Sequence, residues 1–403
     1  MDEREHLNVV VIGHVNAGKS TTCGSILLDS GAIDKHTIEQ YKKEAKHRKC
    51  ESWYLAYIMD TTEEEREKGI TMDVGSANFS TSKRRFTLLD APGHKDFVPR
   101  MIAGASHADV GILVVSAQKG EFESGFEKQG QTREHAILTL SLGIHKLIVA
   151  VNKMDCVGWS KERFDYITEQ LFPFLRGCGY RVKKDVVFVP IASALGAGVV
   201  KSVECEWAEH KSLVQILETV EIEDRNEHAP IRVCVVDSTG TDVSATVKNG
   251  TLRVDQIVHV SPTENVTRIE SIFVDGQSVD YARPGENVSL KLDPPGCKPG
   301  DMLSDERFGK VAFKAMIRVV DVVFVLTKGY PCVLHVNGAM SDCTVAMIWN
   351  VADGTKRTFA KNGDTVYVRL NVQQPVAVES GMRLTLRSAG RTIAIGKVVP
   401  IIS

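Results

Sequence analysis

The sequence lacks the long apolar runs and the cysteine spacing of membrane or disulfide-rich proteins. Its longest apolar stretches, such as VGILVVSA and VVDVVFVL, fall well short of the ~20 residues of a membrane-spanning helix. The N-terminal MDEREHLN has no signal-peptide apolar region. Nine cysteines are scattered without a C-x-x-C pair, which argues against a disulfide framework or a zinc site. We expect a cytoplasmic monomer that does not contact a membrane.

The chain also lacks an excess of either charge. Its 49 Lys and Arg residues against 51 Asp and Glu residues give a formal net charge of -2. No global field therefore attracts a polyanion, and any nucleic-acid contact must be local. Hydrophobic residues at 43% and charged residues at 25% are typical of folded globular chains, and 403 residues fit two or three domains.

Two hydrophobic patterns divide the chain. Up to about residue 220, buried-strand runs such as LNVVVIG and HKLIVAVNK alternate with helix-like stretches, as in βαβ units. From about residue 230, short β-branched runs with Asn249-Gly250 and Asp275-Gly276 turns predict antiparallel strands. We predict an α/β domain with a mostly parallel sheet over residues 1–225, followed by two antiparallel β-barrels over residues 229–305 and 308–403.

A phosphate-binding loop follows the first predicted strand. Residues 13–20, GHVNAGKS, match G-x-x-x-x-G-K-[ST] between a strand and a helix. In such a loop, backbone N–H groups surround the β-phosphate, the lysine reaches the β- and γ-phosphates, and the hydroxyl ligates Mg²⁺. A chance Gly-rich turn would not place all of these groups correctly. The predicted nucleotide contacts are Gly13, His14, Val15, Asn16, Ala17, Gly18, Lys19, Ser20 and Thr21.

A second motif indicates guanine as the base. Asn152, Lys153 and Asp155 belong to an N-K-M-D sequence at the end of the apolar strand LIVAV, where ligands bind in open α/β sheets. A carboxylate there accepts from the N1–H and the 2-amino group of guanine, a donor pair that adenine lacks. Alone, the motif could be a polar turn. Together with the phosphate loop, it predicts GTP or GDP as the ligand.

Further residues predict a γ-phosphate sensor and a catalytic group. Asp90 and Gly93 end another buried strand in D-A-P-G, where the carboxylate can hold a Mg²⁺-bound water and the amide can contact the γ-phosphate. Thr71, in EEEREKGITMDVG, is a second candidate Mg²⁺ ligand beside Ser20. His94 is the candidate for orienting the attacking water. Because no arginine is identifiable as a finger in cis, we expect slow intrinsic hydrolysis and activation by a partner.

These motifs resemble those of the translational GTPases in the elongation factor Tu and elongation factor one-alpha group, and the resemblance covers essentially the whole chain. It implies a P-loop GTPase domain followed by two β-barrels. It also implies that Val15 and Ile70 form a hydrophobic gate beside the catalytic His94, and that the ribosomal sarcin-ricin loop activates hydrolysis. The implied cofactors are GTP or GDP and Mg²⁺.

Two positions depart from the family pattern. The family usually has Asp where this chain has Asn16, and Asn keeps an oxygen for a monovalent cation near the phosphates but lacks the charge. The guanine-contacting S-A motif is matched by type at Ser193, Ala194 and Leu195, whereas a gapless comparison places Ala192 at the serine position.

Several segments are most similar to eukaryotic class II release factors, the GTPase subunits that work with a class I release factor at stop codons. They include ESWYLAYIMDTTEEEREKG, SAQKGEFESGFEKQGQTREHA and GRTIAIGKVV. TMDVG and HKDF are more similar to the ribosome-rescue GTPase that partners Pelota. The balanced charge disfavours a carrier of aminoacyl-tRNA, although a local basic face can be hidden in a balanced total. A GTP-gated adaptor that does not hydrolyse GTP is the non-enzymatic alternative.

Overall fold

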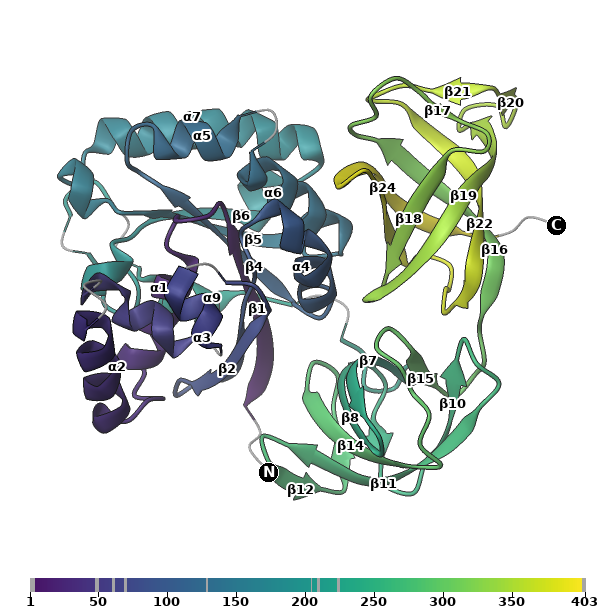
Figure 1. Ribbon diagram of the computed structural model, residues 1–403, viewed down its shortest axis with the longest axis horizontal. Coiled ribbons are helices and arrows are strands. Elements are labelled where there is room, and N and C mark those ends of the chain that lie inside the picture. The colour runs from purple at the N-terminus through teal and green to yellow at the C-terminus, as the bar shows by residue number, and fades with distance from the viewer. Residues whose placement is uncertain are drawn as a thin grey trace. The chain divides into compact units, whose positions relative to one another are not determined.

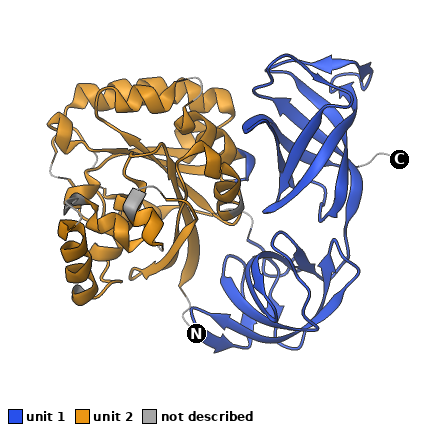
Figure 2. Ribbon diagram, in the orientation of Figure 1, with its two compact units in different colours: residues 1, 141–143, 223–403 blue, residues 2–140, 144–222 orange. Residues whose placement is uncertain are grey.

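The computed structural model describes residues 4–47, 51–59, 62–68, 71–127, 130–203, 205–208, 211–222 and 225–400. The chain divides into two compact units (Figure 2). We call residues 2–140 and 144–222 the α/β unit, and residues 1, 141–143 and 223–403 the barrel unit. None of the helices in the described part of the chain combines the length and the apolar character that crossing a bilayer requires.

A six-stranded sheet forms the centre of the α/β unit, in the order β2-β3-β1-β4-β5-β6 (Figure 1). All neighbours pair in parallel except β2, which is antiparallel to β3 at the edge. Every residue of β4 is buried, which explains why the sequence shows a continuous apolar run there. The strands are β1 (Glu5–Gly13), β2 (Gly75–Ser80), β3 (Arg84–Asp90), β4 (Val110–Ser116), β5 (Lys146–Asn152) and β6 (Val186–Pro190).

Helices cover the sheet. Buried residues of the first and last helices, among them Ile26 and Leu217, share one core with the strands. The α-helices are α1 (Lys19–Asp29), α2 (Lys35–His47), α3 (Glu63–Lys68), α4 (Val98–Ala105), α5 (Glu121–Phe126), α6 (Gln131–Ser141), α7 (Lys161–Cys178), α8 (Val182–Asp185) and α9 (Leu213–Thr219). The 3-10 helices are η1 (Glu51–Ile58), η2 (Lys95–Phe97), η3 (Asp155–Val157) and η4 (Ser193–Leu195).

The barrel unit contains two closed antiparallel barrels. In the first, the order β10-β15-β7-β8-β14-β11 is closed by pairing of β10 with β11. Val233, Val258 and Leu290 are among the side chains that fill it. Its strands are β7 (Arg232–Thr239), β8 (Asp242–Asn249), β9 (Leu252–Arg253), β10 (Ile257–Ser261), β11 (Val266–Val274), β12 (Gln277–Val279), β13 (Tyr281–Ala282), β14 (Asn287–Asp293) and β15 (Met302–Ser304).

The second barrel has the order β18-β23-β24-β16-β22-β19 and is closed by pairing of β18 with β19. Ile317, Val368 and Leu386 are fully buried in it. Its strands are β16 (Lys310–Val319), β17 (Leu326–Thr327), β18 (Pro331–Val336), β19 (Ala339–Asn350), β20 (Lys356–Arg357), β21 (Phe359–Ala360), β22 (Thr365–Val376), β23 (Arg383–Ser388) and β24 (Arg391–Val399).

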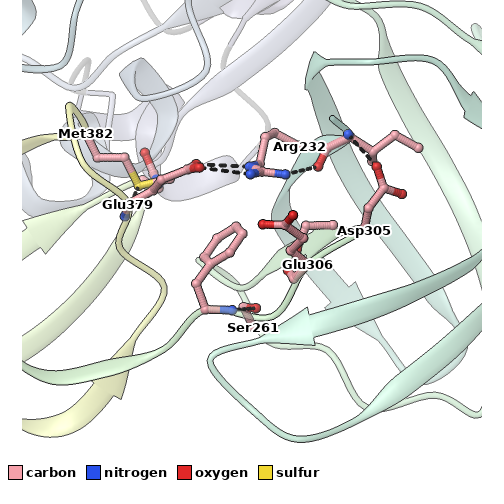
Figure 3. A network of polar contacts seen from close by, with 10 residues as sticks. Arg232, Ser261, Asp305, Glu306, Glu379 and Met382 are labelled. Atoms are coloured by element: carbon pink, nitrogen blue, oxygen red, sulfur yellow. Dashed lines mark hydrogen bonds and ion pairs between the residues drawn. The ribbon is translucent and has the colours of Figure 1, made fainter. Parts of the chain in front are cut away.

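Arg232 of β7 links the two barrels. Its Nε and Nη2 donate to the carboxylate of Glu379 at 3.0 and 2.9 Å, and its Nη1 donates to the carbonyl of Ile231 at 2.8 Å (Figure 3). The guanidinium also lies 4.8 Å from the centroid of the Phe308 ring. Two parallel hydrogen bonds fix the relative orientation of both side chains. We infer that this pair stabilises the junction between the barrels.

The predicted fold class, an α/β P-loop domain followed by two antiparallel β-barrels, is confirmed. The edge strand β2 was not predicted, because GSANFS lacks the β-branched residues by which the other strands were identified. Its pairing with β3 ends at Gly75 opposite Asp90, so this strand connects the Thr71 region to the D-A-P-G motif.

Candidate nucleotide-binding site

The phosphate loop joins β1 to α1. Its backbone has positive φ at Gly13 (145°), Asn16 (60°) and Gly18 (97°). A Cβ at Gly13 would collide with the carbonyl of Val114, and one at Gly18 would collide with the side chain of Asn152. Both positions therefore require glycine. The loop is thus shaped by contacts with the neighbouring strands as well as by its own sequence.

Lys19 lies at the bottom of this loop beside Asp90. Its ammonium donates to the carbonyl of His14 at 3.1 Å, and the side chain is buried. Burial lowers the pKa of Lys19, while the carboxylate of Asp90 opposes that shift. A Cβ at Gly93 would collide with Lys19 Nζ, so the D-A-P-G turn comes as close to the lysine as a backbone can. This arrangement presents an ammonium and a nearby amide to a phosphate.

Ser20 and Thr71 come together as a pair of hydroxyls. Ser20 Oγ lies 3.0 Å from Thr71 Oγ1, although 51 residues separate them in the sequence. Both carboxylate oxygens of Asp90 are buried without a hydrogen bond among the described residues. Burial raises the pKa of Asp90 to about 6, although Lys19 lowers it. Hydroxyl and carboxylate oxygens are the ligands that Mg²⁺ prefers, so this donor set fits a magnesium ion.

Glu65 holds the segment that carries Thr71. Its Oε1 accepts from the backbone N–H groups of Met72 (2.8 Å) and Asp73 (3.1 Å). Its Oε2 accepts from the N–H and the hydroxyl of Thr62 at 3.2 and 3.1 Å. Burial raises the pKa of Glu65, but these hydrogen bonds outweigh it and lower the pKa below its usual value. An ionised Glu65 therefore connects both ends of the segment around Thr71.

The opposite side of the site is organised by Asn152. Its Nδ2 donates to the carbonyl of Ala17 at 2.9 Å, and its Oδ1 accepts from the N–H of Ser193 at 2.9 Å. Ser193 Oγ in turn lies 2.7 Å from Thr22 Oγ1 of α1. One amide side chain thus joins the phosphate loop, the N-K-M-D motif and the 193–195 turn.

Lys153 and Ala192 are the chain neighbours of Asn152 and Ser193. Lys153 has a positive φ of 62° and its ammonium donates to Glu121 Oε2 at 2.7 Å. Ala192 is buried and bridges to Ala197, whereas Ser193 hydrogen-bonds within the site. This geometry favours an S-A motif that begins at Ser193 over the gapless comparison that places Ala192 at the serine position.

These elements surround one cavity of about 440 Å³ in the α/β unit. Such a volume is in the range of small-molecule sites. The described residues that line it are Val15, Asn16, Gly18, Lys19, Ser20, Thr21, Trp53, Ala56, Thr71, Gly93, Gln118, Asn152, Lys153, Asp155, Cys156, Ser193 and Ala194.

Six of the predicted residues that the structure describes are not among the lining residues. Gly13 donates its N–H to His135, and Ala17 contributes its carbonyl to Asn152. His14 contributes its carbonyl to Lys19, and Asp90 is fully buried behind the hydroxyl pair. Leu195 is 69% exposed. His94 caps η2, where its Nδ1 accepts from the N–H of Asp96 at 3.4 Å and lies 3.4 Å from the carboxylate of that residue. Ile70, the second predicted gate residue, lies outside the described residues.

Other residues of the site were not identified from the sequence. Glu65 and Glu121 act through other side chains or backbone amides, and Trp53 and Gln118 line the cavity. His135 of α6 is buried, and its Nδ1 accepts from the N–H of Gly13 at 3.1 Å. Glu65 lies in the acidic run EEEREKG just before the predicted phosphate-sensing residue Thr71, and this position was the sequence signal that could have identified it.

Comparison with protein families decides the identity of this site. Residues 4–226 match the elongation factor Tu GTP binding domain, and residues 310–402 match the elongation factor Tu C-terminal domain. This chain belongs to the elongation factor Tu family of GTP-binding proteins. The family match therefore identifies residues 4–226 as a GTP-binding domain.

Individual relatives carry a more specific name. The chain is 40% identical to the eukaryotic peptide chain release factor GTP-binding subunit of Zygosaccharomyces rouxii, over 99% of this chain and 64% of that protein. The subunit of the same name from Schizosaccharomyces pombe is 39% identical, again over 99% of this chain and 64% of the relative. The chain therefore spans slightly less than two thirds of the length of these curated relatives.

A solved structure supports the fold. The S. cerevisiae Ski7 GTPase-like domain, bound to GDP and inorganic phosphate, superposes with a TM-score of 0.81. The alignment covers 98% of this chain and 97% of that one at 17% sequence identity. At this identity the similarity concerns the fold alone.

Proposed function

We propose that this protein is a translational GTPase that acts in translation termination in the cytoplasm. It would bind GTP with Mg²⁺, hydrolyse the GTP on the ribosome, and thereby promote the action of a class I release factor at stop codons. The names of the two release-factor relatives support the biological role. The observation that carries the chemistry is the single cavity that brings the phosphate loop, Thr71, Gly93 and Asp155 together.

The nucleotide would be held at both ends by this chain's own groups. Lys19 and the loop amides would hold the phosphates, and Asp155, with Ser193 and Ala194 beside it, would contact the guanine. Ser20 and Thr71 would ligate Mg²⁺, with Asp90 holding a water of its coordination shell. When bound, the ion would neutralise charge on the β- and γ-phosphate oxygens. Asn16 lines the same cavity and offers an amide oxygen to a monovalent cation.

His94 would position the attacking water once the ribosome is engaged. Its imidazole hydrogen-bonds to Asp96 at the surface and is 38% exposed, so a partner can reach it. The proposal requires the ring to turn toward the γ-phosphate past Val15, which lines the cavity. Ile70 would form the other side of this gate. Contact with the sarcin-ricin loop of the ribosome would supply the energy for that rotation, so we expect slow hydrolysis by the isolated protein.

The test combines cargo binding with hydrolysis. We expect the GTP-bound protein to bind a class I release factor more tightly than Pelota or aminoacyl-tRNA in parallel titrations. We also expect single-turnover GTP hydrolysis to accelerate when ribosomes are added. A preference for Pelota or tRNA would assign the GTPase to rescue or elongation. GTP-dependent cargo binding without hydrolysis on ribosomes would indicate an adaptor.

A further inference from the structure

The outer surface of the second barrel carries a continuous set of cationic and aromatic side chains. The strands β24, β16, β22 and β19 are neighbours in this barrel (Figure 1). Across them, Lys397 pairs with Met316, Met316 with Tyr367, and Tyr367 with Trp349. In the next row, Lys314 pairs with Arg369. We call these six residues the cationic face.

The alternation of burial shows that the cationic face points away from the core. Ala315 and Ile317 on β16, which flank Met316, are fully buried, and so is Val368 on β22. By contrast, Arg369 and Lys397 are exposed, and the other four residues of the face are partly exposed. Successive side chains of a strand point to opposite sides. The face is therefore available to a partner.

Charge is distributed very unevenly between the two barrels. Residues 308–403 contain 12 Lys and Arg against 5 Asp and Glu, whereas residues 229–305 contain 7 against 11. The strands β16, β22 and β24 contain no acidic residue at all. Asp342 is in β19 but near its start, away from Trp349. The near-neutral total of the chain thus conceals a strongly basic barrel.

Two cations of the face oppose each other directly. Lys314 and Arg369 occupy paired positions on β16 and β22, where Cβ atoms are about 5 Å apart and like charges are destabilising. Instead of a carboxylate, the Lys314 ammonium meets two rings, at 4.6 Å from the Tyr367 centroid and 5.3 Å from that of Trp349. A local rule of sheet pairing is therefore broken, and no ion pair among the described residues compensates for it, as is typical of functional surfaces.

We propose that the cationic face binds a single-stranded RNA segment. Such a strand presents a phosphate and a base at every nucleotide, which matches cations interleaved with aromatic rings. A base that stacks on Tyr367 or Trp349 takes the place of the Lys314 ammonium, which then reaches an adjacent phosphate. An acidic peptide would use the cations but not the rings. This inference does not rest on the proposed GTPase function.

The experiment measures binding of a fluorescein-labelled 12-nucleotide RNA to the full chain without nucleotide or ribosomes. The variant Lys314→Gln/Arg369→Gln/Lys397→Gln should weaken binding by at least tenfold at low salt. It should also reduce the slope of log K against log salt by about 2, since each phosphate contact contributes roughly 0.7. The matched control Lys183→Gln/Lys211→Gln/Lys291→Gln removes the same charge from exposed positions elsewhere and should leave both quantities nearly unchanged.

The rings are tested separately. Trp349→Leu should weaken binding roughly 5- to 100-fold, whereas Trp349→Phe should retain most of it, because stacking requires a π face. Thermal unfolding and GTP affinity verify that each variant is folded. Absence of RNA binding, or equal loss in the face and control variants, would overturn the proposal. So would face-dependent binding of a labelled poly-glutamate peptide in preference to RNA, which would indicate an acidic protein as the partner.

Discussion

The two units of this protein carry their distinctive residues in different places. In the α/β unit, the site is built from loops that follow strands, as at Gly13–Lys19, Gly93 and Asn152–Asp155. In the barrel unit, the distinctive residues lie on strand faces, as in the rows that contain Lys314 and Tyr367. Loop residues that are adjacent in sequence form short motifs. Face residues are distributed over several strands, and they become a group only when the register is known.

Because the site of the α/β unit is built from loops, changes in these loops should alter nucleotide chemistry and leave the barrels intact. The strongest case is Lys19→Ala, which removes the buried ammonium beside Asp90. We expect GTP affinity to fall by about 3–5 kcal/mol, because hydrogen bonds to two charged phosphates are lost, which in practice abolishes binding. Fluorescent-nucleotide titration measures this loss. The control Lys183→Ala, at an exposed lysine of the same unit, should bind GTP like the unmodified protein.

His94→Ala should separate nucleotide binding from hydrolysis within the α/β unit. His94 does not line the cavity, so GTP affinity should stay within about twofold of normal. Ribosome-stimulated single-turnover hydrolysis should slow by about 10²–10⁴ if the imidazole positions the water. A variant with full stimulated turnover would refute this role of His94.

Glu65→Ala tests a residue that acts at a distance from the ligand. Loss of four hydrogen bonds releases the segment around Thr71, so GTP affinity with Mg²⁺ should fall by about 1.5–3 kcal/mol. GDP affinity should change much less, because a switch segment is ordered by the γ-phosphate. Dissociation rates of labelled GTP and GDP report the difference, with the exposed Glu39→Ala as the control. Equal weakening of both nucleotides would contradict the role assigned to Glu65.

Arg232→Gln has the smallest expected effect and concerns the barrel unit alone. Loss of the two hydrogen bonds to Glu379 should lower the free energy of unfolding by about 1–2 kcal/mol and leave GTP binding unchanged. Chemical denaturation measures this. The control Arg268→Gln removes exposed pairs with Asp255 at 3.7 Å and Asp293 at 3.8 Å, and it should cost about 0.5 kcal/mol or less.

The Arg232–Glu379 pair also predicts that the stability of the protein depends on pH. Hydrogen bonds from Arg232 lower the pKa of Glu379 below its ordinary value of 4.5. The contribution to stability is therefore complete above pH 4.5 and is lost as the pH falls through the lowered value. Arg232→Gln should flatten the stability curve in that acidic range. If stability fell with acidic pH in the same way in Arg232→Gln as in the unmodified protein, the titration of Glu379 would not depend on Arg232.

The difference between the units also explains what the sequence could predict. The fold class and the loop motifs were accessible, because apolar strands alternate with helices and because phosphate binding requires glycines, a lysine and a hydroxyl in fixed order. Glu65 was missed because its partners, Met72 and Asp73, are backbone amides and impose no residue type. The cationic face was missed because Lys314, Arg369 and Lys397 come from three different strands, and the total charge averaged them away.

The two hydrogen bonds of the Asn152 side chain predict where compensating mutations should arise. Its side chain accepts from the N–H of Ser193 and donates to the carbonyl of Ala17, so the loop proposed to contact the base and the phosphate loop are joined by one amide. A substitution that shifts one of these loops should therefore also shift the other. Suppressors of mild defects in the phosphate loop should accumulate around codon 193, whose residue bonds to the other end of the same amide.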